Sequence, residues 1–141
     1  MLLMPKKTKH RKWQTGRKHD KRRNAPDTRG VKVAFGSFAI KAVTPARITS
    51  NQIEAARKVI VRTIGKTGKM WIRIFPDRPV TRKAAEVGMG KGKGDPDHFV
   101  ADVKPGRIIF EVEAPTEESA RAALRKAGMK LPVKFKIVER R

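Results

Sequence analysis

The chain has 141 residues, enough for one compact domain, and carries 35 Lys and Arg against 13 Asp and Glu, a formal net charge of +22. This charge requires an anionic partner, and because it is spread along the whole chain, nucleic acid fits better than a membrane surface. The absence of cysteine excludes disulfides and thiolate metal sites and favours a cytoplasmic protein, and every apolar stretch is far shorter than the roughly 20 residues of a membrane span.

The first predicted element is a basic N-terminal arm, residues 1–30, with 11 Lys and Arg against two Asp. It has no apolar period and is interrupted by Gly and Pro, so we expect an extended segment that its partner orders. Its cations would contact RNA phosphates and its Trp would stack on an unpaired base, although a solvated tail or an import signal is the alternative. The arm residues that we expect to bind RNA are Lys6, Lys7, Lys9, Arg11, Lys12, Trp13, Arg17, Lys18, Lys21, Arg22 and Arg23.

The rest of the chain, residues 31–141, is predicted to form a single RNA-binding domain that is also basic, with 24 Lys and Arg against 11 Asp and Glu. Residues 31–43 are rich in Val, Phe and Ile and predict one long or two short strands, with Gly36 as a possible bulge.

A helix follows, because Thr49 and Gln52 have the spacing of a capping box. Gly65 or Gly68 would end it. Its apolar residues at helical spacing are Ile53, Ala56, Ile60 and Ile64.

Two strand-like stretches are separated by a long segment without an apolar period. Residues 70–75 alternate as a strand, and residues 77–97, which contain Pro and several Gly, predict a long extended loop. Residues 98–103 and 107–113 then read as two strands of a hairpin, joined through a Pro-Gly turn at 104–106.

A second helix begins after Thr116, whose hydroxyl suits an N-cap, and Glu117 and Glu118 favour its positive end. Gly128 would close it. Its predicted inward face consists of Ala120, Ala123, Leu124 and Ala127.

Val133, Phe135 and Ile137 alternate and predict a final strand. Strands interleaved with two amphipathic helices favour the α+β class. We expect a two-layer sandwich in which a mostly antiparallel mixed sheet carries both helices on one face, with the basic arm and the Gly-Lys loop extending from it.

Within the loop, residues 88–94 contain four Gly alternating with Met or Lys, which lets the backbone approach a phosphate closely. The segment is not a Walker loop, because Gly94 is followed by Asp95, and it lacks the third Gly of the dinucleotide fingerprint. A mobile connector is the alternative to phosphate binding. The loop residues that we expect to contact phosphates are Arg78, Arg82, Lys83, Gly90, Lys91, Gly92, Lys93 and Gly94.

No residues suggest catalysis. The three histidines, at positions 10, 19 and 98, are scattered, and two of them lie in the arm, without a rigid scaffold. Glu111 and Glu113 are expected on the outward face of a strand. We therefore predict a protein that is not an enzyme, with no catalytic residue, metal, cofactor or small-molecule substrate.

At several points in order along the chain, the sequence resembles the family of bacterial large-subunit ribosomal protein sixteen (universal name uL-sixteen). The Gly-Lys segment and the strand end that precedes Asp77 are its most specific parts. The matching segments are Met4-Pro5-Lys6, Thr8-Lys9, Arg11-Lys12, Phe35-Gly36-Ser37-Phe38, residues 52–57, residues 71–77, residues 89–94, Lys104-Pro105-Gly106 and Lys130-Leu131-Pro132.

The resemblance implies an α+β sandwich that binds 23S rRNA near the central protuberance, beside the A-site tRNA, with the loop directed toward the peptidyl-transferase region. By position, it implies that the arm residues given above bind rRNA and that the loop residues contact tRNA and rRNA. It also implies 5S rRNA and neighbouring large-subunit proteins as further candidate partners, and neither a membrane nor a second copy of the chain. Two departures stand out: Gly88 occupies a position where the family commonly has Arg, and residues 18–28 are longer and more basic than the family pattern.

Two rival functions remain open from the sequence. A DNA-compacting protein would explain the charge alone, and an RNA-modifying enzyme would explain the basic surface and the Gly-rich loop. Preference for duplex DNA over structured rRNA would favour the first, and loss of an RNA modification on depletion would favour the second.

Overall fold

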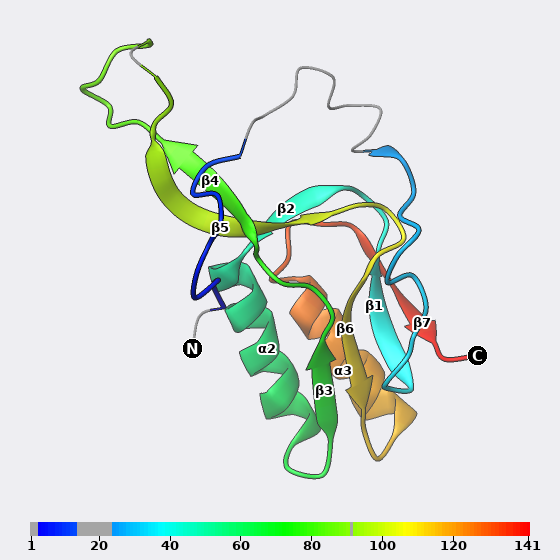
Figure 1. The fold of residues 1–141 in the computed structure, drawn as a ribbon. Helices are drawn as coiled ribbons and strands as arrows, with labels where there is room; N and C mark the ends of the chain where they lie inside the picture. The colour runs from blue at the N-terminus through cyan, green and yellow to red at the C-terminus, as the bar shows by residue number, and fades with distance from the viewer. Residues whose placement is uncertain (1–2, 14–23, 91) are drawn as a thin grey trace.

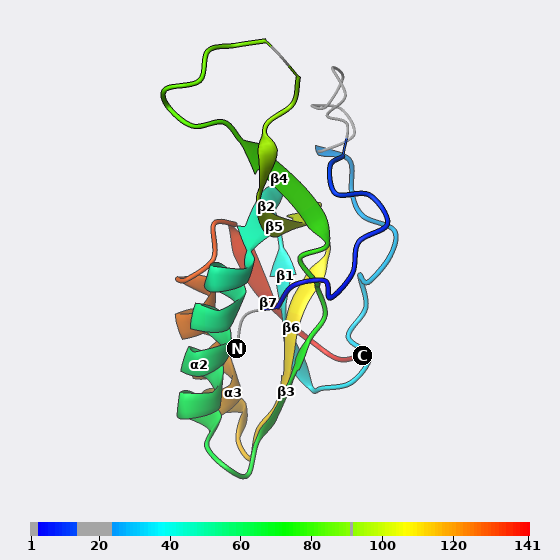
Figure 2. The ribbon, with the colours of Figure 1, turned by 60° about the vertical axis from the view of Figure 1, so that its left-hand side comes forward.

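The computed structural model describes residues 3–13, 24–90 and 92–141 and has two antiparallel sheets. A four-stranded sheet in the order β3-β6-β1-β7 packs against helices α2 and α3, and a three-stranded sheet in the order β2-β5-β4 extends from one end of it (Figures 1 and 2). The elements are β1 Phe38–Ala42, β2 Ala46–Thr49, α2 Ser50–Ile64, β3 Lys69–Ile72, β4 Arg78–Arg82, β5 Asp95–Val103, β6 Ile108–Glu113, α3 Glu117–Gly128 and β7 Phe135–Glu139.

The predicted α+β class and the position of both helices on one face are confirmed. The single mixed sheet is wrong, because the strands divide between two sheets and every strand pair is antiparallel. Among the described residues, no helix is long and apolar enough to cross a membrane.

Helix α2 begins as its capping box predicts. The Thr49 side chain accepts a hydrogen bond from the Gln52 amide, and the Gln52 side chain accepts one from the Thr49 amide at 2.9 Å, which satisfies two amides that the first turn leaves unpaired. Gly65 ends the helix with a φ of 70°. The predicted inward face is buried, with Ile53, Ala56 and Ile60 fully inaccessible.

Helix α3 begins after Thr116, whose side chain accepts a hydrogen bond from the Ser119 amide. Its small inward face lets it approach α2 and the sheet closely, and Phe110 and Ile40 of the sheet are fully buried beneath the helices. Gly128 is the last helical residue, and the C-cap is Met129, one residue after the predicted end. A Cβ at this position would lie 2.3 Å from the Phe135 ring, so only glycine lets β7 pack against the helix end.

The segment of residues 31–37 is irregular, and only β1 forms from the predicted strand 31–43. The segment lies over the sheet face that the helices leave open, where Glu111 accepts hydrogen bonds from the amides of Ala34 and Phe35 and from Arg73 Nη1 at 3.2 Å. Glu111 faces away from the helices as expected, but it is fully buried rather than exposed to solvent. The chain itself covers this part of the outer face.

The predicted hairpin of residues 98–113 is wrong. The tight turn is present, with an Arg107 amide to Lys104 carbonyl bond of 3.2 Å and a Gly106 φ of 95°. However, the turn also bonds to the end of β1, since the Gly106 amide donates to the Ala42 carbonyl at 2.7 Å. The strands β5 and β6 therefore diverge into different sheets.

The predicted loop of residues 77–97 is too long at both ends. Arg78 and Arg82 lie on β4, which pairs with β5 in an antiparallel hairpin, so the connection is confined to residues 83–94. Pro79 and Pro96 led to the prediction of a loop, because proline is uncommon within strands. Pro79 is tolerated because β4 is an edge strand, and Pro96 lies beside a register irregularity.

We predict that Gly128→Ala lowers the free energy of unfolding by about 1–3 kcal/mol, because the added methyl group would overlap Phe135. Urea denaturation would measure the change. Gly88→Ala is the control, since no atom lies within 4 Å of a Cβ at that position. Equal stability of the two variants would contradict the close approach.

We also predict that Glu111→Ala lowers the free energy of unfolding by about 3 kcal/mol, because it leaves Arg73 and two backbone amides without their buried acceptor. Glu113→Ala on the same strand is the control and should cost less than about 1 kcal/mol, since that side chain is exposed. Similar urea midpoints for the two variants would show that the buried carboxylate does not anchor the segment.

Candidate nucleic-acid interface

The described part of the N-terminal arm lies against the start of β4. The guanidinium of Arg78 is 5.7 Å from the centre of the Trp13 ring, within the range of a cation–π interaction. Arg78 is itself oriented by Asp102 of β5, at 2.6 Å from the carboxylate. Trp13 is therefore held on the folded domain while 41% of it remains exposed.

The arm and the loop, which the sequence offered as two separate candidates, meet in the structure. The Lys12 ammonium donates to the Lys93 carbonyl at 3.1 Å, and the Lys93 ammonium donates to the Trp13 carbonyl. These contacts place cations that are about 80 residues apart in the sequence on one surface. We call residues 3–13, 83–90 and 92–94 together the arm–loop surface.

The loop extends away from both sheets (Figure 2). Gly90 and Gly92 have φ values of 102° and 92°, which side chains other than glycine rarely adopt, and no atom lies within 4 Å of a Cβ built at either position. At Gly90 and Gly92, the backbone is therefore open to a partner. Met89 near the tip is 98% exposed.

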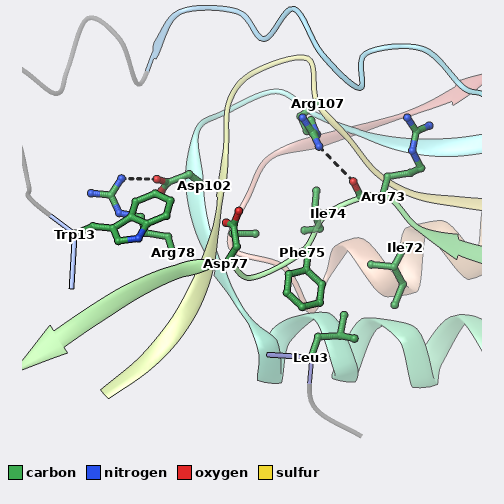
Figure 3. Close-up of a pocket in the computed structure, with 11 residues that line it drawn as sticks. Leu3, Trp13, Ile72, Arg73, Ile74, Phe75, Asp77, Arg78, Asp102 and Arg107 are labelled. Atoms are coloured by element: carbon green, nitrogen blue, oxygen red, sulfur yellow. Dashed lines mark hydrogen bonds and ion pairs between the residues drawn. The ribbon is translucent and has the colours of Figure 1, made fainter. Parts of the chain in front are cut away.

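A cleft of about 540 Å³ lies between the arm and the connection from β3 to β4 (Figure 3). Phe75, which is 46% exposed, lines it together with Trp13, Arg73, Asp77 and Arg107. Aromatic faces and guanidinium groups together suit unpaired bases and phosphates. The cleft offers both chemistries beside the arm.

Arg107 fixes the later part of the arm at this cleft. Its guanidinium donates to the carbonyls of Arg29 and Arg73 at 3.2 and 3.4 Å, and it lies 3.6 Å from Asp27 (Figure 3 shows the Arg73 contact). The backbone adds two further ties, including the Ile108 amide to the Gly30 carbonyl at 2.7 Å. Sequence reasoning assigned no role to Phe75, Arg73 or Arg107, because only the fold brings them together.

The predicted site residues fall into three groups. The arm cations Lys6, Lys7, Lys9, Arg11 and Lys12 are exposed and form no ion pair with a carboxylate of the described residues. The loop cation Lys83 donates to the Gly90 carbonyl, and Arg82 and Gly94 lie at the base of the loop. The predictions for Arg17, Lys18, Lys21, Arg22, Arg23 and Lys91 fall on residues outside the described ranges.

The chemistry of the described ranges is that of an anion-binding surface. Within the part of the chain that the structure describes, no group of three or more His, Asp or Glu side chains is placed to hold a metal ion. His98 pairs with its neighbour Asp97 at 2.8 Å, and both are exposed.

Comparison with known proteins identifies the family of this chain. Residues 5–138 match the family described as ribosomal protein L16p/L10e. The chain is also 52% identical over 139 residues to the large ribosomal subunit protein uL16 of Halorhodospira halophila, which covers 99% of this chain and 98% of that protein. With a family match over nearly its whole length and a close relative of the same extent, the chain belongs to the uL16 family of large ribosomal subunit proteins.

Proposed function

We propose that the arm–loop surface binds 23S rRNA near the central protuberance and helps form the A-site tRNA binding region, with the loop directed toward the peptidyl-transferase region. The observation that carries this proposal is the contact between the Lys12 ammonium and the Lys93 carbonyl, which joins arm and loop into one cationic surface. The proposal also includes 5S rRNA as a neighbour.

Membership of the uL16 family establishes the general role of the chain. The chain is a structural component of the large ribosomal subunit, which in bacteria lies in the cytoplasm, and its partners are rRNA and other ribosomal proteins. The particular RNA segments and the tRNA contact belong to the proposal.

The arm suits phosphate contacts because its cations are exposed and have no carboxylate partners among the described residues. Each phosphate that it neutralises releases condensed counterions, so binding is expected to weaken steeply with salt. Trp13 and Phe75 add exposed aromatic faces for unpaired bases next to these cations.

The loop suits a narrow space between RNA partners. Its glycines keep the backbone bare at positions 88, 90 and 92, and its lysines supply charge without bulk. A tRNA that enters the A site must contact a surface that is cationic but does not obstruct it. The loop meets both requirements.

We predict that replacing Lys91 and Lys93 with Ala in reconstituted large subunits weakens A-site tRNA binding several-fold. The thermal midpoint of the free protein should change little, because exposed loop charges contribute little to folding. Lys58→Ala with Lys126→Ala removes the same charge from exposed positions on the helices and is the control. A collapsed thermal midpoint with normal tRNA binding would contradict the assignment of the loop.

We further predict that replacing Lys6, Lys9 and Arg11 with Ala lets the chain dissociate from large subunits at lower salt than the wild type. The reason is the loss of three phosphate contacts, each of which adds roughly 0.7–0.9 to the salt dependence of log K. Sedimentation after a series of salt washes would measure release. Unchanged release, or preference of the free protein for duplex DNA over rRNA in competition, would remove the arm from the proposal.

A further inference from the structure

A second cationic surface lies on the outer face of the four-stranded sheet, away from the helices. A groove of about 760 Å³ runs there between residues 31–33 and β7. Its lining includes the last residues of the chain, and the C-terminus lies away from the loop (Figures 1 and 2). Its lining residues are Val31, Lys32, Val33, Lys41, Val138, Glu139, Arg140 and Arg141.

The strand register concentrates positive charge on this face. Lys41 of β1 is directly opposite Lys136 of β7, and Ala39 is opposite Val138, so these four side chains share the face that the groove occupies. Arg140 comes two residues after Val138, so the alternation along β7 places it on the same face of the sheet. Like charges directly opposite each other destabilise a sheet, so the pair Lys41–Lys136 carries a cost in the isolated protein.

Nearby carboxylates do not offset this charge. Glu111 is engaged by Arg73 and two backbone amides, and Glu113 accepts a hydrogen bond from Ser37. Glu139 lines the groove, but four cations, Lys32, Lys41, Arg140 and Arg141, line it too, so this one carboxylate leaves an excess of positive charge. Across the described residues, none of Lys32, Lys41, Lys136 and Arg140 forms an ion pair.

We infer that this groove, which we call the sheet-face groove, binds a phosphodiester segment of rRNA separate from the segment at the arm–loop surface. Phosphates would relieve the repulsion between Lys41 and Lys136, and the valines of the groove would pack against ribose. The inference rests on the part of the proposed function that makes rRNA the partner. The chain would then contact two RNA segments, one at the arm–loop surface and one at the sheet-face groove.

The test compares two triple variants of the full chain that lose the same charge. One replaces Lys41, Lys136 and Arg140 with Ala, and the control replaces Lys58, Lys126 and Arg62, which are exposed on the helices. Filter binding to 23S rRNA across a series of KCl concentrations should show that the slope of log K against log salt falls by roughly 2–3 for the groove variant. The control should change it by less than about 1.

The variant Lys136→Glu distinguishes an effect on rRNA binding from an effect on the stability of the fold. It replaces a cross-strand repulsion with an opposite-charge pair to Lys41, so the thermal midpoint should rise while rRNA binding weakens. A residue with only a structural role would move both quantities in the same direction.

Equal salt slopes for the two triple variants would overturn the inference, as would unchanged rRNA binding by Lys136→Glu. A third contrary result would be that the wild type binds poly-glutamate, that the groove variant does not, and that both bind rRNA equally. The last result would assign the groove to an acidic protein segment. Failure of the wild type to bind 23S rRNA would instead refute the proposed function. If the variant that lacks Lys6, Lys9 and Arg11 binds rRNA more weakly while the groove variant binds it as the wild type does, the inference about the groove is wrong and the proposed function still stands.

Discussion

Electrostatic repulsion is the constraint on which the rest of this structure depends. With 35 basic and 13 acidic side chains, the chain cannot pair its cations internally and must either separate them or leave them for a polyanion. The fold does both. The apolar contacts between the helices and the four-stranded sheet form the core. Cations without a carboxylate partner among the described residues lie on the arm, the loop, the outer sheet face and the exposed sides of the helices.

The few carboxylates hold structural positions. Glu111 is buried and joins residues 34 and 35 to Arg73, and Asp102 lies between Arg47 and Arg78 at 3.3 and 2.6 Å. Each of these acids contacts one arginine that lines the cleft beside the arm, Arg73 for Glu111 and Arg78 for Asp102. Acidic residues thus fix the geometry of the basic surface instead of neutralising it.

The two cationic surfaces differ in how the chain builds them. The arm–loop surface consists of extended backbone held by a few hydrogen bonds between Lys12, Trp13 and Lys93, so it can adapt to an RNA partner. The sheet-face groove is built on paired strands, so its cations have fixed spacing. A small protein with both kinds of surface suits a position inside a ribonucleoprotein particle, where RNA surrounds it on more than one side.

The sequence by itself determined the features that local chemistry controls: the capping box of Thr49, the N-cap at Thr116, the inward helix faces, the turn at Gly106 and the excess charge that indicates RNA. Only the tertiary structure decided which strands pair, because turn residues fix a change of direction but not a partner. For the same reason, the sequence did not show that residues 31–37 bury Glu111, that the arm meets the loop, or that Lys41 is opposite Lys136. Those contacts join residues far apart in the chain, and their positions depend on the packing of both sheets.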